Sequence, residues 1–512
     1  MSQAVASKFI SLVPTNGTEF SVNSGQKVIF ELQPSLGLIK GRDSYLVLDI
    51  LNNCSDNTRV MLNNMAGADS IINRIDIYSL RTGQHLETQQ NYNQMSGLVN
   101  QYLFEDKTNL QALQGCGEKV FAYEDNGAGA SQAVTNDAEN VNNNVLSPIN
   151  ANGELLGNFR RYTVPLKAGI FRYWDEERLC NVMGLQGLRI ELTLEDPKES
   201  CFFMTAKNKN GDEFLLSDGA TDGIPCNDLA GAGFNVRATG DFTINGTGLA
   251  VGNEVTISSN VADLNTTINA IADVGANEIQ FTLAAEQAIS TGIRIKLRSD
   301  NRALKVRPEF RVLSIAPPKE LISSMMKGFN YEFTTFDHFV DNIPANARKH
   351  LIELNSVATR AVCVMSQFSD VSKLEGTTSS TYYAGTPPVD SKLNSVVYFL
   401  KSRLVPVRPY NPQITEEKVV SLHELVKSWN AINKESKDLG NFDGANGDQY
   451  TNTYLIGRQL ARQPYYYDLG NAEGQIRLGF SAARTFDMLA DTFVWSRKIV
   501  SVSENGGVQV IL

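Results

Sequence analysis

The sequence predicts an all-β protein made of two consecutive sandwiches. The clearest strand is residues 188–195 (LRIELTLE), where leucine and isoleucine alternate with arginine, glutamate and threonine. A period of two gives a strand one buried and one wet face, as in an antiparallel sandwich. Comparable strands fill both halves of the 512 residues. A single core stops growing at roughly 250–300 residues, so at least two large domains are expected.

The first half reads as strands joined by turns, with one helix. The turn at 81–84 (RTGQ) has glycine where a hairpin needs positive φ. Residues 91–103 carry apolar side chains at helical spacing and predict a helix. Residues 122–158 are poor in large apolar side chains, and we expect a long surface loop there. Strands are predicted at residues 27–32, 44–50, 74–78 and 188–195.

A change of composition marks an insertion after Asp196-Pro197. Residues 200–300 are rich in Gly, Asn, Thr and Ala, and they contain short alternating strands. We expect a small, exposed β-rich subdomain there. The main domain resumes at 305–315, and Pro317-Pro318 ends that strand because proline removes a ladder donor. The strands of the insertion are predicted at 254–258, 278–283 and 292–297.

The second half repeats the strand-rich pattern and includes one helix. Residues 419–429 have apolar side chains at helical spacing, at Val419, Leu422, Val426 and Trp429. Near the end, Asn505-Gly506 lies between alternating runs and is a strong hairpin signal. Strands are predicted at 351–354, 396–400, 475–480 and 492–495.

Bulk properties exclude several classes of protein. The net charge of −10 argues against a surface that packages nucleic acid, and no specific nucleic-acid binding is expected. The six cysteines form no CxxC pair and only four histidines are present, so a zinc site is not expected. We expect reduced thiols and no essential disulfide. No apolar run approaches the roughly 20 residues that span a bilayer, and residues 1–14 do not resemble a signal peptide.

The usual signatures of enzymes are missing, and three residue groups are candidates for a catalytic site. His423-Glu424 lies on the predicted helix without the second histidine of a zincin, so a helix-face pair is favoured. Asp337 and His338 (in FDHF) have no nucleophilic Ser or Cys motif beside them, which favours a strand-edge or interface histidine. Asp175–Glu177 is one local cluster, whereas glycoside hydrolysis needs two opposed carboxylates, so a solvated turn is favoured. We expect no catalytic residue and no enzyme activity.

Two further segments contain side chains suited to ligands. The acidic, glycine-rich loop Asp443–Asp448 has calcium-ligand residue types but lacks EF-hand spacing. Tyr465–Tyr467 could stack on a sugar, but adjacent tyrosines more often divide between a core and an interface. We therefore expect no metal and no cofactor.

Several segments together resemble the double jelly-roll major capsid proteins of double-stranded DNA viruses, in particular those of virophages and polinton-like viruses. The resemblance rests on the order and spacing of the segments and covers about residues 20–190; the second half matches in size and strand density. The insertion at 200–300 departs from the family's minimal pattern. The segments that carry the resemblance are Val28–Pro34, Ser44–Ile50, Ile72–Tyr78, Leu166–Phe171 and Gly184–Leu192.

This resemblance implies an all-β chain of two consecutive eight-stranded jelly rolls with a small β-rich insertion and a few short helices. The expected domains are an N-terminal arm (1–18), a first jelly roll (19–318, with the loop 122–158 and the insertion about 200–300), a connecting helix (319–328) and a second jelly roll (329–512).

The resemblance also implies a structural role. Homotrimers would self-assemble as pseudo-hexagonal tiles of an icosahedral virion shell inside the host cell, with neighbouring trimers, penton proteins and minor capsid proteins as partners. Contact with an internal membrane stays open. Two other classes also stay open: a carbohydrate-binding or glycan-cleaving β-sandwich protein, and a fibre or surface-layer subunit. The lack of a secretion signal weighs against the first, and the lack of tandem repeats against the second.

Overall fold

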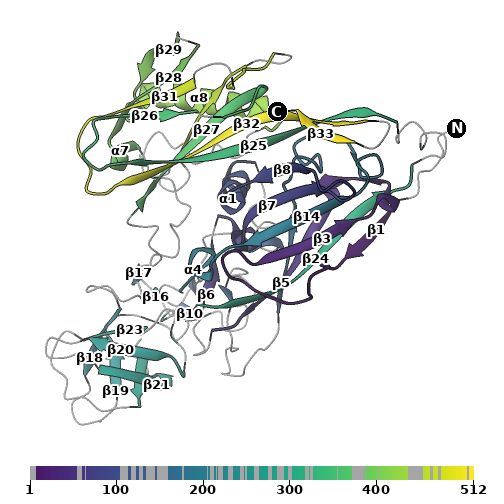
Figure 1. Cartoon of the computed structure of the whole chain (residues 1–512). Coiled ribbons are helices and arrows are strands. Elements are labelled where there is room, and N and C mark those ends of the chain that lie inside the picture. The colour runs from purple at the N-terminus through teal and green to yellow at the C-terminus, as the bar shows by residue number, and fades with distance from the viewer. Residues whose placement is uncertain are drawn as a thin grey trace.

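The computed structural model describes most of the chain. It describes all residues except 1–6, 55–59, 64, 104–112, 117–122, 126–130, 134–144, 147–158, 176–177, 204–205, 208–212, 215, 217–222, 229–234, 241, 243–246, 248, 250, 259–263, 275–278, 285–292, 298–301, 318–321, 323–326, 355, 372–385, 387, 402, 436–453, 462–464, 471–473, 504–506 and 512. Two β-sandwiches lie against each other and a small barrel extends from the first of them (Figure 1).

Two antiparallel sheets form the first sandwich. In one sheet, β1 (Ser7–Leu12) and β2 (Phe20–Ser21) pair with β24 (Leu304–Ile315), which pairs with β5 (Tyr45–Asn52), which pairs with β12 (Arg160–Pro165). Two short strands, β4 (Leu38–Ile39) and β13 (Cys180–Asn181), extend this sheet beside β24. The facing sheet has the order β3 (Lys27–Leu32), β14 (Leu188–Leu194), β7 (Ile72–Ser79) and β8 (His85–Gln89).

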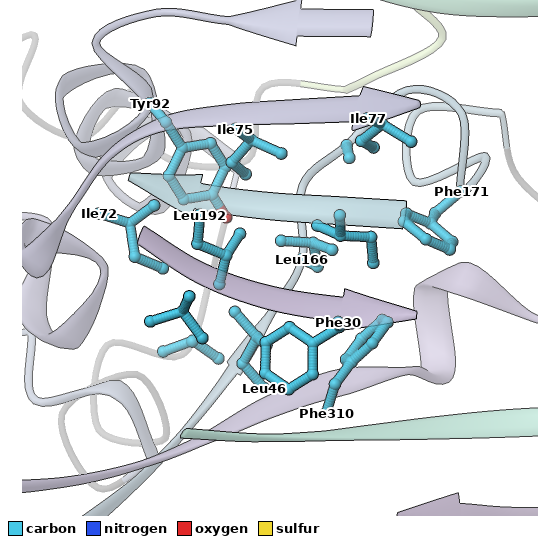
Figure 2. Packing of buried hydrophobic residues seen from close by; sticks show 14 of the residues in the cluster. Phe30, Leu46, Ile72, Ile75, Ile77, Tyr92, Leu166, Phe171, Leu192 and Phe310 are labelled. Carbon is cyan, nitrogen blue, oxygen red and sulfur yellow. The ribbon is translucent and has the colours of Figure 1, made fainter. Parts of the chain in front are cut away.

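The strand β14 shows how the alternating pattern builds this core. Its apolar residues are buried among side chains of both sheets, including Phe30, Ile75 and Phe310 (Figure 2). The predicted strands are therefore confirmed here, but the expectation of a wholly wet second face is wrong. Glu191 is only 6% exposed, because Lys27 and Arg189 pair with its carboxylate at 2.7 and 2.6 Å and cover it.

Connections at one end of the first sandwich meet in a small sheet. It consists of β11 (Val145–Leu146), β6 (Val60–Leu62) and β15 (Cys201–Phe203). Each strand belongs to a different connection: β11 lies between β8 and β12, β6 between β5 and β7, and β15 between β14 and β24. Two hairpins lie in the same connections: β9 (Tyr123–Asp125) with β10 (Ser131–Ala133), and β16 (Ala206–Lys207) with β17 (Glu213–Phe214). Most of the predicted loop 122–158 lies outside the described residues.

The insertion folds into a closed six-stranded barrel with its own core. The three strands predicted from alternation are confirmed as β20 (Glu254–Ser258), β22 (Ile279–Leu283) and β23 (Ile293–Leu297). The barrel order is β18 (Ile224–Asp228), β19 (Asn235–Ala238), β22 (Ile279–Leu283), β21 (Leu264–Asp273), β20 (Glu254–Ser258) and β23 (Ile293–Leu297), closing on β18. Side chains that point inward, such as Val236, Ile257 and Phe281, fill the interior of the barrel and are 0% exposed. Figure 1 shows the barrel apart from both sandwiches.

The second sandwich has the same strand order as the first. One sheet runs β25 (Phe329–Ile343), β32 (Met488–Val502), β27 (Ala361–Asp370) and β30 (Leu455–Gln459), with β33 (Val508–Ile511) paired to β32. The facing sheet runs β26 (Lys349–Glu353), β31 (Gly474–Phe480), β28 (Leu393–Leu400) and β29 (Arg403–Tyr410). The hairpin predicted at Asn505-Gly506 joins β32 and β33, although its two turn residues lie outside the described residues.

Helices occur on the connections. The predicted helix at 91–103 is α1 (Tyr92–Leu103), and that at 419–429 is α8 (Thr415–Ala431). Of the four apolar residues that suggested α8, only Trp429 is buried, because the helix turns Leu425 and Trp429 toward β30 and leaves Val419 54% exposed. Most of the predicted connecting helix at 319–328 lies outside the described residues. The short helical elements are η1 (Pro34–Leu36), η2 (Gly41–Asp43), η3 (Gly67–Ile71), α4 (Pro197–Ser200) and α7 (Pro388–Ser391).

All six cysteines lie among the described residues, and none of them is paired with another in a disulfide. Among the described residues, no helix is long and apolar enough to cross a membrane.

Candidate functional site at the junction of the sandwiches

The two sandwiches meet through different surfaces. The first contributes the edge strand β8, the helix α1 and the connection between β12 and β14, while the second contributes the sheet that contains β25, β32 and β27. The contact is therefore heterologous, since neither sandwich uses the surface that the other uses. Buried polar and aromatic side chains of both sandwiches meet at this junction.

An aromatic cluster forms the apolar part of the junction. Trp174 of the first sandwich meets Trp495 of β32 edge to face, with ring centroids 4.7 Å apart. Tyr102 of α1 lies 5.9 Å from Trp429 of α8. Both contacts join residues distant in sequence, and all three tryptophans of the chain are fully buried here. Such aromatic pairs contribute beyond the area that they bury, by about 0.5–1.5 kcal/mol each.

Glu87 of β8 is the polar centre of the junction. Its Oε1 accepts bonds from the backbone N–H of Gly169 (2.9 Å), the hydroxyl of Thr335 in β25 (2.6 Å) and the side-chain amide of Gln89 (3.0 Å). Its Oε2 accepts from the backbone N–H of Ile170 (2.8 Å). The carboxyl is 1% exposed. Burial raises its pKa above the ordinary value, and the bonds donated by Thr335, Ile170 and Gly169 oppose that rise. Through the carboxyl group of Glu87, the strand β8 of the first sandwich is bonded to the strand β25 of the second.

A second polar group lies beside α1. Gln94 donates to Gln367 of β27 and to Asp491 of β32, each at 3.0 Å. His338 Nε2 of β25 lies 2.9 Å from the other oxygen of Asp491 and 3.4 Å from Asn91. A buried carboxylate of the second sandwich is therefore satisfied partly by the first, so separating the two would leave it unpaired at a cost.

Close approach at the junction requires a glycine. A Cβ added at Gly169 would lie 2.1 Å from the backbone oxygen of Thr334 in β25. The neighbouring residues continue the contact: Tyr331 donates to the carbonyl of Ile170 at 2.6 Å, and the guanidinium of Arg172 lies 4.0 Å from the Tyr331 ring. Any larger residue at 169 would push the two sandwiches apart.

A buried ion pair supports α1 from behind. Lys167 Nζ lies 2.6 Å from Asp69 and 2.6 Å from the hydroxyl of Ser96, and the lysine and aspartate side chains are 2% and 0% exposed. Ser96 also bonds Asp69. A buried pair of this kind is costly to break, because removing one partner leaves an uncompensated charge. It fixes α1, and hence the junction, to the first sandwich.

Comparison with known proteins identifies the fold. No protein-family model matches the sequence. No curated protein matches it either. Solved structures similar to this chain include a quasi-atomic model of the PBCV-1 virus capsid, with a TM-score of 0.50 and 11% identity over 100% of this chain and 98% of that chain. Another is the Faustovirus major capsid protein, with a TM-score of 0.51 and 9% identity over 97% and 90% of the two chains. This chain has the double jelly-roll fold. The fold class predicted from the sequence is confirmed.

Those residues singled out from the sequence for catalysis that the structure describes do not assemble into one site. In the second jelly roll, Asp337 faces Lys498 at 2.9 Å, while the adjacent His338 belongs to the junction. Glu424 of α8 pairs with Arg458 of β30 at 2.6 Å, and His423 is exposed. Among the described residues, no group of three His, Cys, Asp or Glu side chains is arranged to hold a metal ion.

The expectation of a solvated turn at Asp175–Glu177 is wrong for Asp175. This residue is 7% exposed, and its carboxylate accepts from Thr334 of the second jelly roll and from Arg172, each at 3.4 Å. The second jelly roll covers Asp175, and the local sequence pattern does not predict this contact. Glu176, Glu177 and the loop Asp443–Asp448 lie outside the described residues.

The three adjacent tyrosines differ in burial. Tyr467 is 7% exposed and packs in the core of the second jelly roll, whereas Tyr465 is 75% exposed. Tyr466 lies between these extremes, with the guanidinium of Arg360 at 4.3 Å from its ring. Sequence reasoning missed Glu87 and Gln94, since a single polar residue in a strand or helix carries no signal of its partner in another domain.

Proposed function

We propose that this chain is a structural major capsid protein that self-assembles as pseudo-hexagonal homotrimers into an icosahedral virion shell. The observation that carries the proposal is the double jelly roll itself, with a match along nearly the full length to solved structures titled as capsid and major capsid proteins. The proposed self-association, virion location and structural role all follow from this similarity to capsid proteins.

The internal repetition supports a trimer of six lobes. Both jelly rolls have the same order of strands in both of their sheets, so one chain supplies two similar lobes. Their contact is heterologous, and a heterologous contact that repeats by rotation closes into a ring. Three chains then supply the six lobes of a near-hexagonal tile. Neighbouring trimers, penton proteins and minor capsid proteins would be the further partners, with assembly inside the host cell.

A non-enzymatic role fits the buried chemistry. Two polar residues of the junction each accept a bond from the other jelly roll, Glu87 from Thr335 and Asp491 from Gln94. Groups held in this way stabilise a fixed arrangement of domains. Their role in this proposal is to make each chain a rigid tile.

Electron microscopy and sedimentation of the purified protein test the proposal. The expected particle is a trimer of six lobes in projection that forms sheets or closed shells on concentration. A stable 56.3 kDa monomer at all concentrations would overturn it. Binding of a polysaccharide by that monomer would instead favour the carbohydrate-binding alternative.

A further inference from the structure

We infer that Lys167 and Asp69 of the first jelly roll join in an intramolecular amide (isopeptide) bond, which the folded protein forms by itself. The inference goes beyond the proposed function and does not depend on it. Lys167 follows β12 and Asp69 lies in η3, so the bond connects two segments 98 residues apart. The reaction needs an amine, a carboxyl group and a proton relay held together away from water, and the buried cluster around Asp69 contains all three.

The two reacting side chains are in contact and removed from solvent. Lys167 Nζ lies 2.6 Å from Asp69 Oδ2, and the two side chains are 2% and 0% exposed. Because Oδ2 is bonded to Cγ, the nitrogen is at most about one bond length farther from the carbon that it attacks. Groups held in this way react as if at an effective concentration of about 10⁵–10⁸ M, which offsets the low reactivity of a carboxylic acid toward an amine.

Burial also favours the reactive forms of the two groups. A charge that is removed from water is costly, and a buried group can avoid that cost by becoming neutral. Transfer of one proton from Lys167 Nζ to Asp69 Oδ2 replaces the ion pair by a neutral amine and a neutral carboxylic acid. These are the nucleophile and the electrophile of amide formation, since a lysine amine becomes nucleophilic when it loses its charge.

Ser96 of α1 lies between the two groups and can carry a proton from one to the other. Its hydroxyl accepts a bond from Lys167 Nζ at 2.6 Å and donates to Asp69 Oδ2. Nζ attacks Cγ and forms the C–N bond, while the hydroxyl takes a proton from the nitrogen and passes its own proton to Oδ2. The C–O bond then breaks and Oδ2 leaves as water. The products are one amide and one water molecule, so no oxidant or reductant is needed.

Tyr92 of α1 is placed to stabilise the tetrahedral intermediate. Its hydroxyl lies 3.5 Å from Asp69 Oδ1, the oxygen that becomes negative, and 3.4 Å from the carbonyl oxygen of Pro165. The same hydroxyl accepts a bond from the backbone N–H of Lys167 at 3.2 Å, which holds it beside the reacting residue. Burial and the charge of Asp69 raise the pKa of Tyr92, so its hydroxyl keeps its proton at neutral pH. A donor near the developing oxyanion stabilises the transition state of acyl transfer.

Mass spectrometry of the denatured wild-type protein tests the inference. We expect a mass lower than that of the sequence by one water molecule. Trypsin cannot cut after an acylated lysine, so the digest should contain a branched peptide that joins residues 60–74 to residues 162–172. The full sequence mass, with cleavage after Lys167, would overturn the inference. Loss of water confined to the peptide 60–74 would also overturn it, because that result indicates a cyclic imide at Asp69-Ser70.

A second ion pair is an internal control in the same digest. Lys27 Nζ lies 2.7 Å from Glu191, but the lysine side chain is 50% exposed. This pair should stay unlinked, because an amine in contact with water keeps its charge. An equal yield of amide at Lys27 would show that burial does not direct the reaction and would overturn the mechanism.

Two serine variants test the proton relay. The protein is made by cell-free synthesis and sampled into denaturant at timed points, so that the intact mass reports how fast the bond forms. Ser96→Ala should slow bond formation about 100-fold or more, the usual contribution of a general acid–base group. Ser70→Ala removes a neighbouring buried hydroxyl that bonds the carbonyl of Ser200, and this variant should match the wild-type rate. Equal rates for the two variants would overturn the role of Ser96.

Discussion

Glu87 is the residue at which the two jelly rolls depend on each other most directly. Its carboxyl is buried and accepts bonds from the backbone of the first jelly roll and from Thr335 of the second. Hydrogen bonds to a charged group are worth about 1.5–3 kcal/mol. Loss of the Thr335 hydroxyl alone should therefore produce a measurable change in the free energy of unfolding.

Thr335→Val removes that hydroxyl and keeps the shape of the side chain. We expect the free energy of unfolding to fall by about 1–3 kcal/mol, since the Glu87 carboxylate loses one donor in a buried place. Urea unfolding followed by tryptophan fluorescence measures the change. Thr163→Val on the half-buried outer side of β12 is the matched control and should change the free energy by less than about 0.5 kcal/mol. Equal effects of the two variants would contradict the role given to Glu87.

The raised pKa of Glu87 predicts a pH dependence of known sign. The folded protein holds the proton to a higher pH than the unfolded chain does, so this group's contribution to stability is lost as pH rises through the folded pKa. Glu87→Gln cannot titrate, and any change that it makes in hydrogen bonding is the same at every pH. The free energy of unfolding of Glu87→Gln, relative to that of wild type, should therefore increase from about pH 4.5, near the ordinary pKa of a glutamate, to about pH 8. Glu31→Gln is the control, and a similar trend there would refute the assignment.

At the scale of elements, the barrel formed by β18 to β23 has a core separate from those of the jelly rolls. Its buried residues, from Leu216 to Leu297, include none of the residues of the other three clusters. We propose that residues about 200–300 form a protruding subdomain. The strands on either side of it, β14 and β24, are both central to the first jelly roll.

Deletion of residues 204–301 with a short glycine-serine linker tests this independence. We expect soluble protein whose jelly rolls unfold within about 1 kcal/mol of the full chain, because no core side chain of either jelly roll is removed. Circular dichroism and urea unfolding measure this. The complementary fragment of residues 214–299 should show a cooperative transition of its own. Complete loss of soluble protein on deletion would show that the insertion supports the first jelly roll.

At the scale of the whole molecule, the proposed trimer should depend on burial more than on exposed charge. An obligate contact usually buries more than roughly 2,000 Å². The exposed ion pairs Arg161–Asp49 and Arg307–Glu19 on the first jelly roll are already satisfied within one chain, so salt has little attraction between chains to screen there. We expect the trimer to persist at nanomolar concentration and from about 0.1 to 0.5 M salt, where the Debye length shortens below about 10 Å. Analytical ultracentrifugation decides this, and dissociation that tracks salt concentration would indicate a contact made by charge.

The sequence by itself determined the local elements. Alternation placed β14 and three strands of the barrel, and helical spacing placed α1, because both patterns reflect which side of a single element is buried. It also indicated the fold class, through the order and spacing of segments such as Ile72–Tyr78 and Gly184–Leu192. These properties are carried by residues close together in the chain.

Only the tertiary structure decided how these elements combine. The closure of the insertion into a barrel, the burial of Asp175 and the bonds of Glu87 all depend on residues that lie far apart in sequence. The same holds for α8, whose buried side is set by β30 and not by its own apolar pattern. Contacts between domains involve one or two residues from each segment, so they leave no periodic signal, and their energy appears only when the chain brings both partners together.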